Sequence, residues 1–139
     1  MGKGKIVAVS GGFDPIHVGH VRMILAAAEH GDVIVFANSD DWLKRKKGYA
    51  FMPFAERSEI LEAIRGVIRV VEAPALDGTV CETIKTIRPD VFANGGDRKA
   101  DNTPEVVLCK KLGIDLMWNV GGGKIQSSSE LVEASKKHD

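Results

Sequence analysis

The sequence has no surplus of charge, no long apolar run and little cysteine, and each shortage excludes a class of protein. Lysine plus arginine and aspartate plus glutamate both number 19, which argues against a general nucleic-acid binder, because such proteins are usually basic. No apolar run approaches the roughly 18 residues needed to cross a membrane. The segment before the first apolar run is too short and too mixed for a secretory signal. We therefore expect a cytoplasmic protein that binds neither nucleic acid nor membrane.

The two cysteines, Cys81 and Cys109, lie far apart and lack the spacing of metal ligands. Both fall in helical patterns, so we expect reduced, structural thiols and no metal site built from protein side chains. The chain of 139 residues is long enough for a real core. It shows no repeat or linker, which predicts a single domain over residues 1–139.

Apolar runs alternate along the chain with helical patterns, and this alternation indicates the fold class. Because the runs are continuous rather than alternating, the strands are expected to be buried on both faces. The pattern predicts an α/β fold: a Rossmann-like, doubly wound, five-stranded parallel sheet with helices on both faces. The expected strands are 6–9, 32–38, 67–71, 90–93 and 114–118, and the expected helices are 18–30, 53–65, 79–87, 104–112 and 128–137. Gly31 and Gly113 are expected to end helices, and residues 40–53 are expected to form a long basic connection.

The unusual segments all follow expected strands. They are residues 11–20, 38–49, 94–98 and 119–129. Because ligands of such sheets bind at the carboxyl ends of the strands, these segments are expected to converge on one functional edge.

Residues 11–20 read Gly-Gly-Phe-Asp-Pro-Ile-His-Val-Gly-His and carry the strongest signal. A strand ends in a glycine turn and a helix begins, which places free backbone N–H groups at the positive end of a helix. His17 and His20, three residues apart, share one face of that helix. The segment therefore predicts an anion site for a phosphate chain. The plain alternative is an ordinary turn with two solvated histidines.

This segment resembles the signature of the nucleotidyltransferase superfamily that includes the cytidylyltransferases, a Gly-x-Phe-Asp turn followed by His-x-Gly-His. The later motifs are similar to those of glycerol-phosphate cytidylyltransferases and heptose-phosphate nucleotidyltransferases. The resemblance implies that His17 and His20 hold the β- and γ-phosphates of a nucleotide, with Gly11, Gly12, Phe13, Asp14 and Gly19 around it. Many members carry Thr or Cys where this chain has Gly12.

The second segment supplies candidate acceptor residues. By resemblance, Asp40 faces the acceptor; the alternative is a cap or turn role for Asn38-Ser39-Asp40. The run Lys44-Arg45-Lys46-Lys47-Gly48-Tyr49 is either a solvated face or a functional loop. Its resemblance to a Lys-Lys-x-Tyr motif assigns Lys44 to the acceptor and Lys46 to catalysis.

Arg57 is unusual on physical grounds. Leu61, Ile64 and Ile68 continue its helical row, so Arg57 lies on the face expected to be buried, and a charge there needs a partner. It either pairs with an internal carboxylate or points from the helix end at a ligand phosphate. The resemblance assigns it to catalysis and acceptor binding, and assigns Arg65 to acceptor binding. An Asp that the family often has near Ile68 is missing.

The last two segments have both plain and functional interpretations. Asn94-Gly95-Gly96-Asp97 is a strong turn signal that also resembles the family's Gly-Gly-Asp, which assigns Gly95 and Asp97 to nucleotide binding. Ser127 and Glu130 fit a capping box, and a helix start also holds phosphates. The resemblance assigns Ser127, Ser128 and Ser129 to the nucleotide. The Arg-Thr pair that precedes this cluster in glycerol-phosphate enzymes is missing, and Lys124 is expected to replace its cation at the nucleotide.

Taken together, the resemblance implies a nucleotidyltransferase that joins a nucleoside monophosphate from CTP or ATP to a small phosphorylated acceptor and releases pyrophosphate. The favoured function is a cytidylyltransferase that acts on a polyol or sugar phosphate. An adenylyltransferase acting on a sugar phosphate or flavin mononucleotide is the alternative. A non-catalytic nucleotide-binding regulator is the alternative from another class. Mg²⁺ is expected on the phosphates. A homodimer is left open, with Trp42 and Trp118 as candidate interface anchors.

Overall fold

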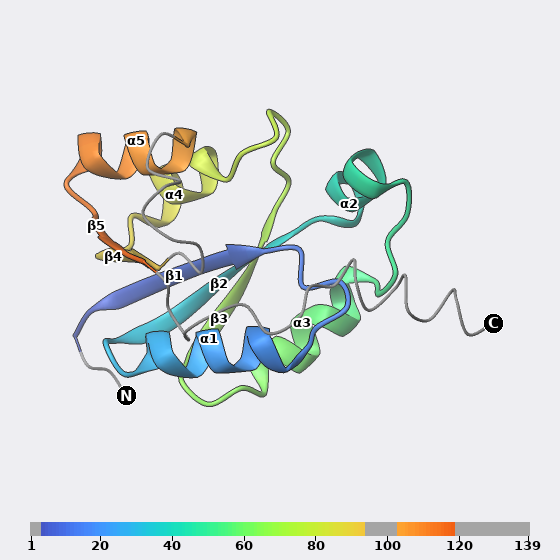
Figure 1. The fold of residues 1–139 in the computed structure, drawn as a ribbon, viewed down its shortest axis with the longest axis horizontal. Coiled ribbons are helices and arrows are strands. Elements are labelled where there is room, and N and C mark those ends of the chain that lie inside the picture. The colour runs from blue at the N-terminus through green and yellow to red at the C-terminus, as the bar shows by residue number, and fades with distance from the viewer. Residues whose placement is uncertain (1–3, 94–102, 119–139) are drawn as a thin grey trace.

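A computed structural model describes residues 4–93 and 103–118 of the chain. Five parallel strands form one sheet in the order β3-β2-β1-β4-β5. The strands are β1 (Ile6–Gly11), β2 (Asp32–Asn38), β3 (Val67–Ala73), β4 (Val91–Ala93) and β5 (Asp115–Met117). The predicted α/β class and the five-stranded parallel sheet are confirmed (Figure 1).

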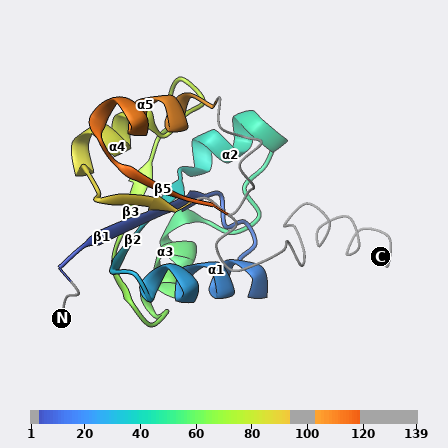
Figure 2. The ribbon, with the colours of Figure 1, turned by 60° about the vertical axis from the view of Figure 1, so that its left-hand side comes forward.

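Helices cover both faces of the sheet. Helices α1 (Val18–Ala28) and α3 (Phe54–Glu62) lie on one face, and α4 (Cys81–Ile87) and α5 (Pro104–Leu112) lie on the other. Both views show this three-layer arrangement, with α2 (Asp40–Lys47) beyond the carboxyl ends of the strands (Figures 1 and 2). None of the helices in residues 4–93 and 103–118 is long and apolar enough to cross a membrane.

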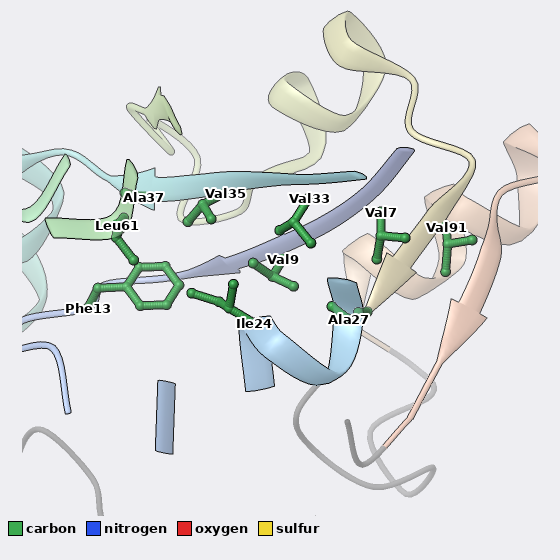
Figure 3. Close-up of a cluster of buried hydrophobic side chains, with 11 residues drawn as sticks. Val7, Val9, Phe13, Ile24, Ala27, Val33, Val35, Ala37, Leu61 and Val91 are labelled. Atoms are coloured by element: carbon green, nitrogen blue, oxygen red, sulfur yellow. The ribbon is translucent and has the colours of Figure 1, made fainter. Parts of the chain in front are cut away.

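Two apolar cores lie on either side of the sheet because successive strand residues point to opposite faces. Figure 3 shows the first core, in which valines of β1 and β2 pack on α1 and α3. Its buried members include Val7, Val9, Val33, Val35, Ile24, Ala27 and Leu61. The second core joins the intervening strand residues to α4 and α5, and includes Ala8, Ile34, Phe36, Ile84 and Cys109. Burial on both faces explains the continuous apolar runs in the sequence.

The strand order places a topological switch point beside β1. From β1 the chain crosses to β2 and β3 on one side, and later to β4 and β5 on the other. Ligands in such sheets bind in the crevice at the carboxyl ends of the strands near this point. The turn after β1 therefore occupies the expected binding position.

Strand β2 and helix α5 have the predicted bounds, but the basic connection is corrected. Residues 40–47 form helix α2 rather than a loop. The Ser39 hydroxyl accepts a hydrogen bond from the Trp42 N–H at its start, and Gly48, with φ +87°, ends it. Lys and Arg residues favour helices. The run of positive charge was therefore a poor reason to expect a loop here. The expected final helix, 128–137, lies outside the described residues.

The role predicted for Gly31 is also corrected, whereas Gly113 does end its helix with φ +76°. Helix α1 ends at Ala28, with its C-cap residue Glu29 in the right-handed region. A Cβ on Gly31 would lie 2.6 Å from the carbonyl oxygen of Lys5. Glycine is therefore needed here for close approach of two backbone segments.

Both cysteines are free thiols, as expected from the sequence. Cys81 is half-buried at the start of α4, and Cys109 is buried within α5. Burial raises the pKa of the Cys109 thiol to about 11, with smaller contributions from Cys81 and Glu105. Cys109 therefore stays protonated near neutral pH and acts as a small apolar core residue.

Gly66 in the turn before β3 gives a stability prediction. Its φ is +94°, and a Cβ there would lie 2.5 Å from the Cβ of Ala28. We expect Gly66→Ala to lower the free energy of unfolding by about 2–4 kcal/mol, because strain and overpacking add. Urea denaturation measures the change. Gly78→Ala is the control, since Gly78 has φ +84° but open space around it. Equal losses in the two variants would show that the Ala28 contact contributes nothing.

Candidate functional site

A pocket of about 360 Å³ lies where the turn after β1 meets helix α2. The turn and the start of α1 contribute one wall, and α2 contributes the other. The lining residues are Gly12, Phe13, Asp14, His20, Trp42, Leu43, Lys46 and Lys47. The first two of the four predicted segments thus meet at the carboxyl edge of the sheet.

The two histidines form the start of helix α1. His17 is the N-cap residue, and its Nδ1 accepts a hydrogen bond from the Gly19 N–H at 3.1 Å. The Nδ1 of His20 accepts one from the His17 N–H at 3.2 Å. The rings stack with centroids 3.8 Å apart. The pair thus builds a reciprocal capping box from imidazoles in place of the usual Ser or Thr and Glu or Gln.

This capping arrangement fixes the tautomer of both neutral rings. A ring nitrogen that accepts a hydrogen bond carries no proton, so the proton of each neutral imidazole resides on Nε2. Each Nε2 is then a hydrogen-bond donor. Two adjacent donors at the positive end of a helix suit the oxygens of a phosphate chain.

Phe13 lines the pocket, but its side chain packs inward, and its predicted place around the nucleotide stays a prediction. Phe13 is 2 % exposed and belongs to the core beneath α1. Its ring meets His20 edge-on, with centroids 4.9 Å apart. Its backbone φ is +53°, an unusual value for a residue with a side chain. Phe13 therefore supports the His20 ring from inside the protein.

Asp14 also lines the pocket, and its side chain forms internal bonds, while its predicted nucleotide contact stays a prediction. The carboxylate is 1 % exposed and accepts hydrogen bonds from the N–H groups of Phe51 and Met52. The ammonium of Lys47 lies 3.1 Å from this carboxylate and also donates to the Asp14 carbonyl. The buried charge is thus paired and hydrogen-bonded, as a buried carboxylate must be.

Helix α2 separates the predicted lysines. Lys46 lines the pocket that contains His20, with its ammonium 5.9 Å from the ring centroid of Trp42. Lys44 instead lines a second pocket, of about 520 Å³, on another side of the helix. The structure therefore does not bring the predicted acceptor residue Lys44 to the histidines. Sequence reasoning missed Lys47, although its i, i+4 spacing from the buried Leu43 indicates an inward side chain.

For Arg57, the structure shows the first of the two alternatives, pairing with an internal carboxylate. The side chain is fully buried, and its Nη2 lies 2.7 Å from the Oδ1 of Asp40. The same oxygen accepts the N–H of Phe54 at the start of α3. Within the segment Asn38-Ser39-Asp40, Ser39 has the capping role that was the alternative, while Asp40 pairs with Arg57 and its predicted contact with an acceptor stays a prediction. Arg57 is enclosed and does not line the pocket beside His20, so its predicted role in catalysis and acceptor binding stays a prediction.

Arg65, which was predicted to bind the acceptor, lies at the edge of the sheet opposite the histidines. It precedes Gly66, whose carbonyl accepts the N–H of Val33 near the amino end of β2. The seven residues of β3 separate this turn from the carboxyl edge, a distance of about 20 Å. Arg65 is exposed there and is far from the histidines.

Glycines at the turn allow the close packing of its walls. A Cβ on Gly12 would lie 3.2 Å from the Leu43 side chain and 3.9 Å from Trp42. One on Gly11 would lie 3.3 Å from the Phe13 ring. Gly19 contributes its N–H to His17. The remaining predicted nucleotide-binding residues lie outside the described part of the chain: Gly95, Asp97, Lys124, Ser127, Ser128 and Ser129.

Comparisons with known proteins agree on the family and the fold. A family model described as cytidylyltransferase-like matches residues 8–133. The bifunctional protein HldE of Syntrophotalea carbinolica is 38% identical over 86% of this chain, and the match covers 23% of HldE. The FAD synthase of Pyrococcus horikoshii is 37% identical over 79% of this chain and 75% of that enzyme. The chain thus spans about a quarter of the HldE relatives that it matches.

A solved structure shares the fold. The lipopolysaccharide core biosynthesis protein of Thermoplasma volcanium superposes with a TM-score of 0.64 at 19% sequence identity. The match covers 82% of this chain and 93% of that protein.

Proposed function

The chain belongs to the cytidylyltransferase-like family of nucleotidyltransferases, and we propose that it transfers a nucleoside monophosphate to a small phosphorylated acceptor. The observation that supports this most directly is the histidine pair. Two capped imidazoles at one helix start lie beside a pocket that also contains Lys46. Such a cluster of donors and positive charge suits a triphosphate.

In the proposed reaction an oxygen of the acceptor phosphate attacks the α-phosphorus of the nucleotide in line. The bond between the α-phosphorus and its bridging oxygen to the β-phosphate breaks, and pyrophosphate leaves. The acceptor phosphate is already a nucleophile, so the protein contributes positioning and charge stabilisation. The Nε2–H groups of His17 and His20 hold the β- and γ-phosphates, and Lys46 offsets the charge that develops on the leaving group.

Two nucleotide and acceptor pairs have support. Similarity to FAD synthases favours ATP, with flavin mononucleotide as one acceptor, since their product contains an adenylyl group. The run Lys46-Lys47-Gly48-Tyr49 favours CTP with a polyol phosphate, by its resemblance to glycerol-phosphate cytidylyltransferases. In this run Lys47 lies 5.0 Å from the Tyr49 ring centroid. The similarity to HldE extends the acceptor class to sugar phosphates by analogy with heptose-phosphate enzymes.

Mg²⁺ fits this site through the nucleotide. The carboxylate of Asp14 at the pocket is committed to Lys47 and two backbone N–H groups. Within residues 4–93 and 103–118, no three His, Cys, Asp or Glu side chains are grouped to hold a metal ion. We therefore propose that Mg²⁺ arrives bound to the phosphates and lowers their negative charge. His17, His20 and Lys46 bind and orient the same phosphate chain.

Pyrophosphate release tests the proposed function. The assay pairs each of CTP, ATP, GTP and UTP with glycerol phosphate, ribitol phosphate, phosphocholine, heptose phosphate and flavin mononucleotide. We expect release that depends on the acceptor with one nucleotide. Nucleotide binding without release in any pair would instead favour a non-catalytic binding protein. No nucleotide binding at all would overturn the proposed site.

The two lysines of α2 give a matched prediction. We expect Lys46→Met to lower kcat for pyrophosphate release about tenfold, because a charge that acts on the leaving group is lost. Lys44→Met should change kcat less than about twofold, because Lys44 lines the other pocket. Steady-state kinetics of the two variants measures the difference. A larger loss of kcat with Lys44→Met would indicate that the phosphate chain binds in the pocket lined by Lys44, and would contradict the proposed site.

A further inference from the structure

We infer that Arg57 is a positioning residue that acts from inside the protein, through the Gly12–Phe13 peptide, on the ring of His20. This inference rests on the proposed function, in which His20 holds a phosphate. It replaces direct contact between Arg57 and an acceptor with control of the geometry of the histidine.

The guanidinium of Arg57 joins three backbone segments. Nη1 donates to the carbonyls of Gly12 and Asn38, both at 2.7 Å, and Nε donates to that of Met52 at 2.8 Å. Nη2 donates to Asp40 at 2.7 Å. The carbonyls belong to the turn after β1, the end of β2 and the segment before α3. The Arg57 side chain thus joins the turn after β1 to the end of β2 at the carboxyl edge of the sheet.

Only arginine suits this position. Its guanidinium carries five N–H donors in a rigid plane, so it can bind acceptors in several fixed directions. Lysine would place a single ammonium there and lose the directed bonds. Burying a charge is costly unless it is fully partnered. Four short hydrogen bonds, one of them to the Asp40 carboxylate, meet that requirement here.

The hydrogen bond from Arg57 to Gly12 acts on His20 through a single intervening residue, Phe13. The Gly12 carbonyl belongs to the peptide that leads into Phe13, so Arg57 sets the plane of that peptide. Phe13 has φ +53°, a conformation that costs about 1–2 kcal/mol for a residue with a Cβ. The fixed peptide holds Phe13 in this conformation, and the Phe13 ring then makes a T-shaped contact with the His20 ring.

Asp14 holds the same turn from the other side. It binds the N–H of Met52, whereas Arg57 binds the carbonyl of Met52. The turn at residues 12–14 and the segment before α3 are therefore joined by two buried charges of opposite sign. Loss of Arg57 releases the Gly12 side of this closed network and leaves the Asp14 side intact.

The test compares Arg57→Lys with Arg45→Lys. Arg45 also donates to two carbonyls, those of Pro74 and Ala75, but they lie away from the turn. We expect Arg57→Lys to lower kcat about 10- to 100-fold, as small misplacements of reacting groups do, with nucleotide KM changed less than about threefold. Arg45→Lys should leave kcat unchanged. In NMR spectra, the His20 ring signals should shift in Arg57→Lys alone.

A second variant covers the case in which Arg57→Lys does not fold. Phe13→Leu keeps an apolar core residue and Arg57 but removes the ring edge against His20. It should lower kcat with little change in nucleotide KM and shift the His20 signals. Unchanged His20 signals in a folded Arg57→Lys, or in Phe13→Leu, would overturn the inference. If the wild-type chain releases no pyrophosphate, the proposed function fails, while the NMR comparison still decides the positioning role.

Discussion

Replacing His20 by asparagine is expected to lower kcat for pyrophosphate release about 100- to 1,000-fold while leaving the fold intact. The Nδ1 of His20 accepts the His17 N–H at 3.2 Å, and the Oδ1 of an asparagine can accept the same hydrogen bond. The capping box is therefore kept. The Nε2 donor is lost, and with it the contact to a phosphate whose charge grows as pyrophosphate leaves.

His30→Asn is the matched control for this prediction. His30 is exposed just beyond the far end of the same helix, so neither turnover nor stability should change. Thermal unfolding of both variants separates folding from catalysis. A His20→Asn enzyme that folds and keeps near-normal kcat would remove His20 from the mechanism.

The loss of the Asp14 carboxylate is expected to lower the stability of the protein strongly. Asp14→Ala should lower the free energy of unfolding by about 3 kcal/mol. It leaves the N–H groups of Phe51 and Met52 without their acceptors, and Lys47 without its counter-ion. Lys47 is 20 % exposed, so its ammonium regains some water, which limits the loss.

Asp41→Ala is the control for Asp14. Asp41 is exposed in the first turn of α2, where a negative charge contributes about 0.5 kcal/mol through the helix dipole. Urea denaturation of both variants measures the difference. A loss for Asp14→Ala no larger than that for Asp41→Ala would contradict the account of Asp14 as the buried anchor of the turn.

Much of the architecture could be predicted because local patterns and global fold agree. The continuous apolar run of β2 indicated a strand covered on both faces, and Pro104 and Gly113 bounded α5. Parallel strands place all their carboxyl ends at one edge. The meeting of residues 11–20 with residues 38–49 therefore followed from topology, without knowledge of any contact.

Local patterns were a poor guide to the partners of a residue where tertiary contacts decide them. Gly31 has the sequence context of a helix end, but it is needed for contact with the Lys5 backbone, a neighbour that no local pattern reveals. Arg57 was predicted to be buried, yet two of its carbonyl partners, those of Gly12 and Asn38, come from distant segments. Asp14 lies in a motif associated with nucleotide binding, but its side chain binds the backbone of residues 51 and 52.

The most direct measurement uses ATP or CTP in two forms, one labelled at the α-phosphate and the other at the γ-phosphate. Each form is incubated with the acceptor that supports pyrophosphate release, and the label is followed into the products. Our account predicts that α-label appears on the acceptor and that all γ-label appears in pyrophosphate. Transfer of γ-label to the acceptor would identify a phosphoryl transfer instead. That result would contradict a site in which His17 and His20 hold the leaving pyrophosphate.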